Sequence, residues 1–214
     1  MGGIPPWAGQ DALSVQREVL RLSMRLPLGS LIGQFVITLL MAAYFGHPDH
    51  LPQAVLWLAL VLAGQGLRVL APLKLPELDA HAIRQALRWH RLRVLFSAMA
   101  WGSAGVLLFE ADDAARQLAL TVAMVSSCIA FSFSASSDGG TLKLALPLLI
   151  GPIVFSLLAS PQPYMWALGL IGASFIVLMH RLVQDRSHQL EENIALRIEA
   201  QRARDEKQRF FAAA

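Results

Sequence analysis

Few side chains in this sequence have the types and spacing that catalysis or metal binding requires. The chain contains one cysteine, which excludes a disulfide framework and a cysteine-rich zinc or iron–sulfur site. The sequence has no glycine-rich phosphate loop, no HExxH motif and no GxSxG motif. His47 and His50 flank Asp49 in a single short loop, but one loop rarely supplies enough ligands for a metal ion. We therefore predict no catalytic residue, no metal site and no cofactor in this chain.

The candidates for a ligand site are polar side chains inside long apolar stretches, because such groups are costly to place in a membrane. Gln34 and Gln65 lie in the first two stretches, where they either hydrogen-bond to each other or contact a ligand. Ser126, Ser127 and Ser132 lie in the fourth stretch. Their hydroxyls favour either close helix packing or a polar wall of a ligand pocket.

Aromatic residues are expected at the ends of the apolar stretches, where their rings meet the headgroup region of a bilayer. Trp57 and Trp166, with Tyr44 and Tyr164, fit such a belt. Trp101 lies deeper in its stretch, which makes it a further candidate for the ligand pocket.

The composition indicates a membrane protein. Of the 214 residues, 55% are hydrophobic and 15% are charged, whereas about 25% charged is usual in a soluble domain. Mean hydropathy is +0.50. Six apolar stretches are each roughly long enough for a helix that crosses the hydrocarbon core. They cover residues 27–45, 52–72, 94–109, 117–134, 142–159 and 164–183, and they predict an all-α bundle of six transmembrane helices.

The segments between these stretches alternate in charge. Arginine and lysine are concentrated before the first stretch, between the second and third, and after the sixth, whereas loops 47–50, 110–116 and 160–164 together hold one basic residue, Arg116. Since cytoplasmic loops retain basic residues, both termini are predicted to be cytoplasmic. The predicted organisation is a cytoplasmic amphipathic segment over 1–26, a transmembrane bundle over 27–183 and a cytoplasmic helix over 184–214.

The last segment has the charge pattern of a parallel two-stranded coiled coil. Residues 182–211 contain neither glycine nor proline. Acidic residues and arginines each recur every seven residues, and the arginines follow the acids by five. This spacing suits ion pairs between position g of one helix and position e of its partner. We assign dimer contact and signal transmission to Asn193, Leu196, Ala203 and Phe210. The alternative is a single solvated helix held by pairs four residues apart. In the dimeric register, position d holds Leu182, Gln189, Leu196, Ala203 and Phe210, and position a holds Met179, Arg186, Asn193, Ala200 and Lys207.

The sixth apolar stretch runs into this charged helix without a helix breaker, so the two are expected to form one continuous rod. A movement of the sixth span would then reach Phe210 directly. Gly169 and Ala173 give the membrane part of the rod a small-residue face, which favours close packing either in a dimer or within the chain. A rod that leaves the membrane is typical of a signal transmitter rather than of a closed transporter.

The C-terminal sequence AQRARDEKQRFFAAA, residues 200–214, resembles the lead-in to the phosphoacceptor box of bacterial sensor histidine kinases. In that family the lead-in continues into Ser-His-Asp, and the histidine is phosphorylated. The resemblance implies a parent protein of the bacterial inner membrane that autophosphorylates from ATP and Mg²⁺ as a dimer and then phosphorylates a response regulator. The chain would be the input half of that parent, without kinase activity of its own. The matching residues are Lys207, Arg209, Phe210, Phe211, Ala212, Ala213 and Ala214.

Other functions explain fewer features. The input region of another membrane signalling enzyme, such as a diguanylate cyclase, would share the architecture but not the FFAAA ending. A six-span transporter would leave the charged helix unexplained, and the spans lack an acidic residue for ion coupling. The expected partners are the lipid bilayer, a second copy of the chain, a response regulator contacted through the kinase domain and a lipophilic ligand. No nucleic-acid partner is expected.

Overall fold

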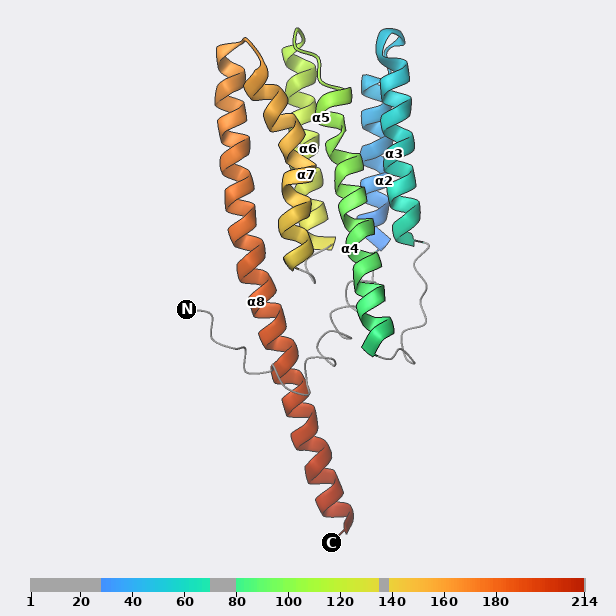
Figure 1. The fold of residues 1–214 in the computed structure, drawn as a ribbon, viewed down its shortest axis with the longest axis vertical. Coiled ribbons are helices and arrows are strands. Elements are labelled where there is room, and N and C mark those ends of the chain that lie inside the picture. The colour runs from blue at the N-terminus through green and yellow to red at the C-terminus, as the bar shows by residue number, and fades with distance from the viewer. Residues whose placement is uncertain (1–27, 70–79, 135–138, 214) are drawn as a thin grey trace.

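The computed structural model describes residues 28–69, 80–134 and 139–213, and these residues form a bundle of helices (Figure 1). No strand occurs in the described ranges, which confirms the all-α class predicted from the sequence. The predicted amphipathic segment over 1–26 lies outside the described residues. The elements are α2 (Leu28–Phe45), the short 3-10 helix η1 (Pro48–His50), α3 (Leu51–Val69), α4 (Ala80–Gly102), α5 (Ala104–Leu107), α6 (Ala114–Ser134), α7 (Gly139–Ala159) and α8 (Pro163–Ala213).

Within the described residues, four helical segments are long and apolar enough to cross a membrane: Pro48–Leu67, Ala114–Ser132, Gly140–Ala159 and Pro163–Ile194. The segment Ile32–Phe45 is also apolar but shorter. The predicted third span, 94–109, is not among these segments. Helix α4 begins with a basic half and ends at Gly102, so its apolar part is short. The basic half carries Arg84, Arg88, Arg91 and Arg93. Four such helices indicate a membrane protein.

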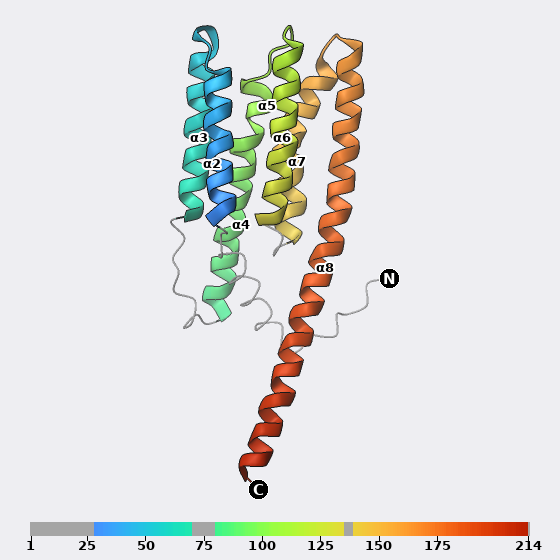
Figure 2. The same cartoon turned by 180° about the vertical axis from the view of Figure 1, so that it is seen from behind.

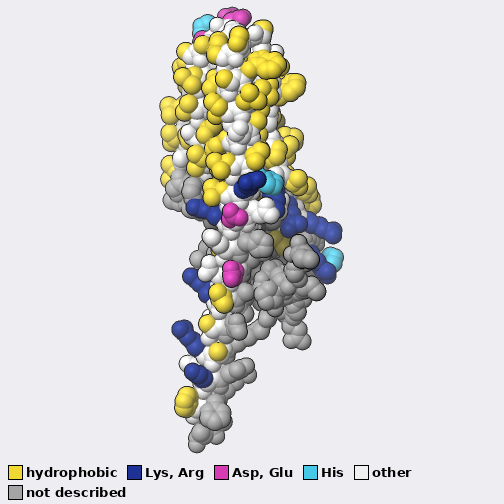
Figure 3. Space-filling view, turned by 90° about the vertical axis from the view of Figure 1, so that its left-hand side faces the viewer, with side chains coloured by type: hydrophobic (Ala, Val, Ile, Leu, Met, Phe, Trp, Pro, Cys, Tyr) yellow, Lys and Arg dark blue, Asp and Glu magenta, His cyan; other side chains and the backbone are white. Residues whose placement is uncertain are grey.

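The surface of the bundle is apolar around its upper part and charged at its lower end. Large hydrophobic side chains are highly exposed, for example Leu40 at 65%, Phe155 at 72% and Ile171 at 65%. Such an apolar surface is unfavourable in water and is typical of a lipid-facing one. In the face shown by Figure 3, lysine and arginine side chains lie below the apolar band and along the lower part of α8, together with some acidic and histidine side chains. At the opposite end the coloured charged and histidine side chains are acidic residues and histidine.

Five long helices form a closed ring, and the sixth packs on its outside. Helices α2, α3, α4, α7 and α6 contact one another in that order, and α6 contacts α2 to close the ring. Helix α8 makes its main contact with α7 alone. Figures 1 and 2 show α8 at the edge of the bundle from opposite sides. This arrangement leaves α8 with one main neighbour, α7, whereas each ring helix has two.

The α4–α5 junction packs closely against α7. Pro152 lacks an N–H, so the carbonyl of Leu148 four residues earlier receives no helix hydrogen bond from it. Gly102 lies directly against this carbonyl, and a Cβ atom at Gly102 would collide with it. One turn further, the Ser156 hydroxyl donates a 2.7 Å hydrogen bond to the carbonyl of Gly105. Because Gly102 has no side chain, α4 can pack against the Leu148 carbonyl, which receives no hydrogen bond from Pro152.

The third predicted span is not one uninterrupted helix. Helix α4 ends at Gly102, and α5 begins at Ala104. Between them, the Ser103 hydroxyl donates a 2.7 Å hydrogen bond to the carbonyl of Ala100. The predicted stretch 94–109 is thus divided, because glycine and a serine that bonds its own backbone both weaken a helix.

Helix α8 is continuous over 51 residues, as the sequence predicted. At 1.5 Å per residue it is about 75 Å long, and its lower part extends well beyond the ring (Figure 1). Its small residues pack within the chain: a Cβ atom at Gly169 would lie 2.7 Å from the side chain of Leu158, and one at Gly172 would lie 2.8 Å from that of Val154. Of the two open interpretations, the Gly169 face therefore serves packing against α7.

Candidate functional site

The predicted contact between Gln34 and Gln65 is present. The Gln65 side-chain nitrogen donates a 2.7 Å hydrogen bond to the side-chain oxygen of Gln34, joining α3 to α2. Gln34 is buried, and its backbone carbonyl accepts a 2.7 Å hydrogen bond from the Thr38 hydroxyl. One hydrogen bond therefore joins the two glutamines across a helix interface, which is the structural one of the two roles considered for them, while the side-chain oxygen of Gln65 is buried without a partner.

Trp57 and Trp101 form the aromatic centre of the bundle. Their ring centroids lie 5.7 Å apart at an interplanar angle of 83°, an edge-to-face contact. Both side chains are fully buried, and neither indole nitrogen has a hydrogen-bond partner. The prediction that Trp57 belongs to an interfacial belt is therefore wrong, because its ring faces the interior. Trp166, by contrast, is 56% exposed, and its indole nitrogen donates a 3.0 Å hydrogen bond to the carbonyl of Ser160.

The three serines of α6 do not form one polar wall. Ser126 is exposed, whereas Ser127 is buried and its hydroxyl has no hydrogen-bond partner. Ser132 lies about one and a half turns further along and donates a 2.8 Å hydrogen bond to the carbonyl of Cys128. Because each residue advances the helix by about 100°, neighbouring serines point in different directions. Only Ser132 of the three lines the cavity described next.

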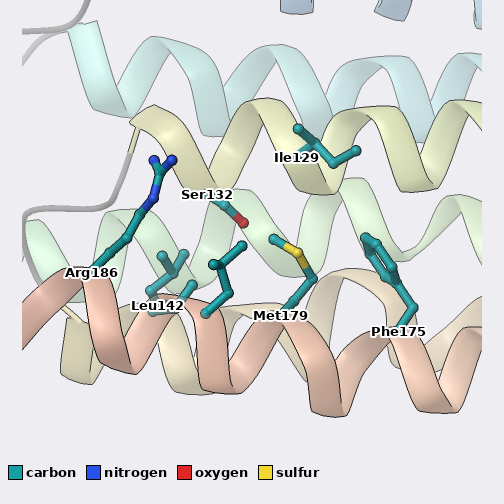
Figure 4. A pocket seen from close by; sticks show the side chains of 8 residues that line it. Ile129, Ser132, Leu142, Phe175, Met179 and Arg186 are labelled. Carbon is teal, nitrogen blue, oxygen red and sulfur yellow. The ribbon is translucent and has the colours of Figure 1, made fainter.

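A cavity of about 240 Å³ lies between α6 and α8, with α7 behind it. Its lining is almost wholly apolar, and it lies near the basic end of the bundle. Figure 4 shows Ser132 pointing into the space between the two helices, with Phe175 and Met179 facing it from α8. The lining residues are Ile129, Ser132, Leu142, Phe175, Met179, Leu182, Val183 and Arg186.

Arg186 is the one charged side chain among the eight that line this cavity. It extends from α8 toward the last turn of α6 (Figure 4). The carbonyl end of a helix carries partial negative charge, so a guanidinium is favourable there. The sequence predicts Arg186 only as a heptad position, and it did not indicate that this side chain lines a cavity.

The predicted seam of the exit helix is accessible along its described part. Leu196 is 57% exposed and Ala203 is exposed, while nothing is described of the Phe210 side chain. The Asn193 side-chain nitrogen donates a 2.8 Å hydrogen bond to the carbonyl of Gln189 on the same helix. Met179, assigned to an a position, belongs instead to the bundle core and is 7% exposed. The seam available to a partner therefore begins below Met179.

The end of the bundle opposite its basic end is held by a small ion-pair network. Arg116 hydrogen-bonds to the carboxylate of Glu110, and its Nε lies 3.4 Å from a carboxylate oxygen of Asp113. His50 lies 3.8 Å from Glu110. His47 pairs instead with Asp49 at 3.6 Å. In the ranges that the structure describes, no group of three or more potential metal ligands comes together. The network ties η1 and the loop before α6 together.

The described residues thus offer a glutamine pair, a buried aromatic pair, a seam on α8 and an apolar cavity with one cationic side chain. The cavity between α6 and α8 is suited to a ligand, since ligand sites are concave, mostly apolar and carry few polar groups. A larger and more open apolar hollow, of about 490 Å³, lies along α4 beside Arg93. Comparisons with protein-family models, with curated proteins and with solved structures found no match to this chain.

Proposed function

We propose that this chain is the membrane-embedded input region of a bacterial sensor histidine kinase and that α8 carries its signal to a kinase core. The observation that carries the proposal is the continuity of α8 from Pro163 to Ala213. One helix thereby joins the outer end of the bundle to the FFAAA sequence that resembles the lead-in of a phosphoacceptor box. A stimulus that shifts the membrane part of α8 is transmitted along the helix without an intervening hinge.

In this proposal the six long helices all cross the inner membrane, and both termini lie in the cytoplasm. The basic half of α4, with Arg84 and Arg88, extends below the bilayer, while its apolar half, from Val94 onward, lies within it. Loop 47–50 and loop 110–116 then face the periplasm. The distribution of basic residues supports this orientation, because cytoplasmic segments retain lysine and arginine.

The position of α8 outside the ring supports its role as the moving element. The ring helices each pack on two neighbours, whereas α8 packs mainly on α7. Its exposed seam, including Leu196 and Ala203, is available to the same helix of a second copy. Kinase cores of this class act as dimers, and a parallel pair of exit helices would place two cores side by side.

The proposal is tested by fusing the chain, after Ala214, to the catalytic core of a characterised histidine kinase in membranes. We expect ATP-dependent phosphorylation that depends on helical register. Insertion of one heptad after Ala200 keeps the seam in phase and preserves the basal level, whereas insertion of four residues rotates it and changes that level severalfold. Equal phosphorylation of both insertion variants and the parent fusion would contradict the proposal.

A further inference from the structure

We propose that the cavity between α6 and α8 binds a single-chain anionic amphiphile, with its acidic headgroup on Arg186 and its hydrocarbon chain among the apolar lining residues. This inference names the ligand class of the proposed input region and therefore rests on that proposed function. Three features support it: the shape of the cavity, its single charge and its place between the ring and the moving helix.

The shape fits a slender apolar chain. Pockets for drug-sized molecules typically occupy about 300–1,000 Å³, and this cavity holds about 240 Å³. The lining residues on α8 run from Phe175 to Arg186, which is about 16 Å along the helix axis at 1.5 Å per residue. The cavity is thus long relative to its volume, as an acyl chain requires. Ile129, Leu142 and Met179 supply hydrocarbon and sulfur contacts along this length.

The charge selects an acidic headgroup. The planar guanidinium of Arg186 has five N–H donors, so beside the interaction that it already makes within the chain it can donate two parallel hydrogen bonds to a carboxylate or phosphate. Ser132 already donates its proton to the carbonyl of Cys128, so its hydroxyl does not compete for the anion. Arg186 also lies at the basic end of the bundle, where the headgroups of the cytoplasmic leaflet are placed by the proposed orientation.

The location couples the ligand to α8. One wall of the cavity belongs to α6, a member of the closed ring, and the other to α8, which packs outside it. A bound chain fills the space between the two helices and holds α8 at a fixed distance from α6. Met179 and Val183 line the cavity and also belong to the bundle core, so the ligand would contact residues that seat α8 on α7.

The test uses the full chain in nanodiscs of zwitterionic phosphatidylcholine and a long-chain fatty acid that carries a photoreactive diazirine near its methyl end. We expect labelling of peptides from α6 and α8 that contain cavity residues. Arg186→Gln should reduce this labelling about tenfold, the loss of a charged hydrogen bond. Arg181→Gln is the matched control, because Arg181 is an exposed arginine of the same helix outside the cavity lining, and it should label like the parent. Equal labelling of Arg186→Gln and Arg181→Gln would overturn the proposal.

Competition identifies the headgroup. Unlabelled fatty acid and lysophosphatidylglycerol each carry one chain and one acid, and the better competitor shows whether the site takes a free carboxylate or a lipid phosphate. A neutral fatty alcohol of equal length should compete at least tenfold less well, and equal competition by the alcohol would overturn the assignment of an anionic ligand. Arg186→Lys keeps the charge and should restore part of the labelling, which separates loss of charge from misfolding. Disulfide crosslinking between two copies of Leu196→Cys in the absence of fatty acid tests the dimer of the proposed function. Failure of the ligand proposal can thus be distinguished from failure of the proposed function.

Discussion

Gln65 of α3 donates a 2.7 Å hydrogen bond to the buried side-chain oxygen of Gln34 in α2. The pair joins two neighbouring helices of the ring inside an apolar environment, where an unpaired amide is costly. Each glutamine therefore has part of its hydrogen-bonding capacity met by the other, so we expect the effects of replacing them on stability to be coupled.

Replacement of either glutamine by leucine should destabilise the bundle by about 1 kcal/mol, because one amide then remains buried without its partner. The double replacement should cost less than the sum of the single ones, because no unpaired amide is left. Unfolding of Gln34→Leu, Gln65→Leu and the double variant in mixed micelles measures this coupling. Strictly additive losses would show that the hydrogen bond contributes nothing to stability.

This contact was predictable from the sequence because two lone polar residues in adjacent antiparallel spans have few alternatives. The continuity of α8 was predictable for a similar reason, since no glycine or proline interrupts residues 182–211. The cavity was not predictable from the sequence, because it depends on the distance between α6 and α8 and on the position of α7 behind them. The burial of Trp57 was also missed, since the sequence does not show which face of α3 meets α4.

Gly102 should be intolerant of any side chain. A Cβ atom there would meet the Leu148 carbonyl, which belongs to rigid backbone rather than to a flexible side chain. We expect Gly102→Ala to destabilise the protein by about 1–3 kcal/mol through overpacking. Gly66→Ala is the matched control, because a Cβ atom at Gly66 meets nothing within 4 Å, and it should be neutral or slightly stabilising. Thermal unfolding in detergent compares the two; similar midpoints would contradict the close approach of α4 to α7.

Trp101 should contribute to stability far more than a tryptophan on the surface. Its ring is 1% exposed and packs edge-to-face on Trp57. Trp101→Ala leaves a large void and should cost about 3–5 kcal/mol. Trp89→Ala provides the comparison, because Trp89 is 54% exposed on α4, and the loss there should stay below about 1 kcal/mol. Denaturant midpoints followed by circular dichroism measure both; an equal loss at the two positions would place Trp101 outside the core.

The ion-pair network around Glu110 should stabilise the loop before α6. Glu110→Ala removes the carboxylate that Arg116 and His50 share, while their side chains remain. We expect a loss of about 1–2 kcal/mol at low salt, and a smaller loss at high salt, where partly exposed charges are screened. Asp112→Ala, an exposed acid two residues away, should have little effect. Midpoints of thermal unfolding at both salt concentrations provide the measurement, and identical behaviour of the two variants would show that the network is not stabilising.

The central claim is that α8 transmits a signal as one helix of a parallel dimer, and disulfide crosslinking in nanodiscs tests it most directly. Single cysteines replace Leu196 or Ala203 at the seam, or Gln201 on the opposite face, in a Cys128→Ala background that removes the one native thiol. The account predicts efficient crosslinked dimers for Leu196→Cys and Ala203→Cys and little for Gln201→Cys. Monomers at all three positions, or crosslinking as strong at Gln201→Cys as at the seam, would contradict it.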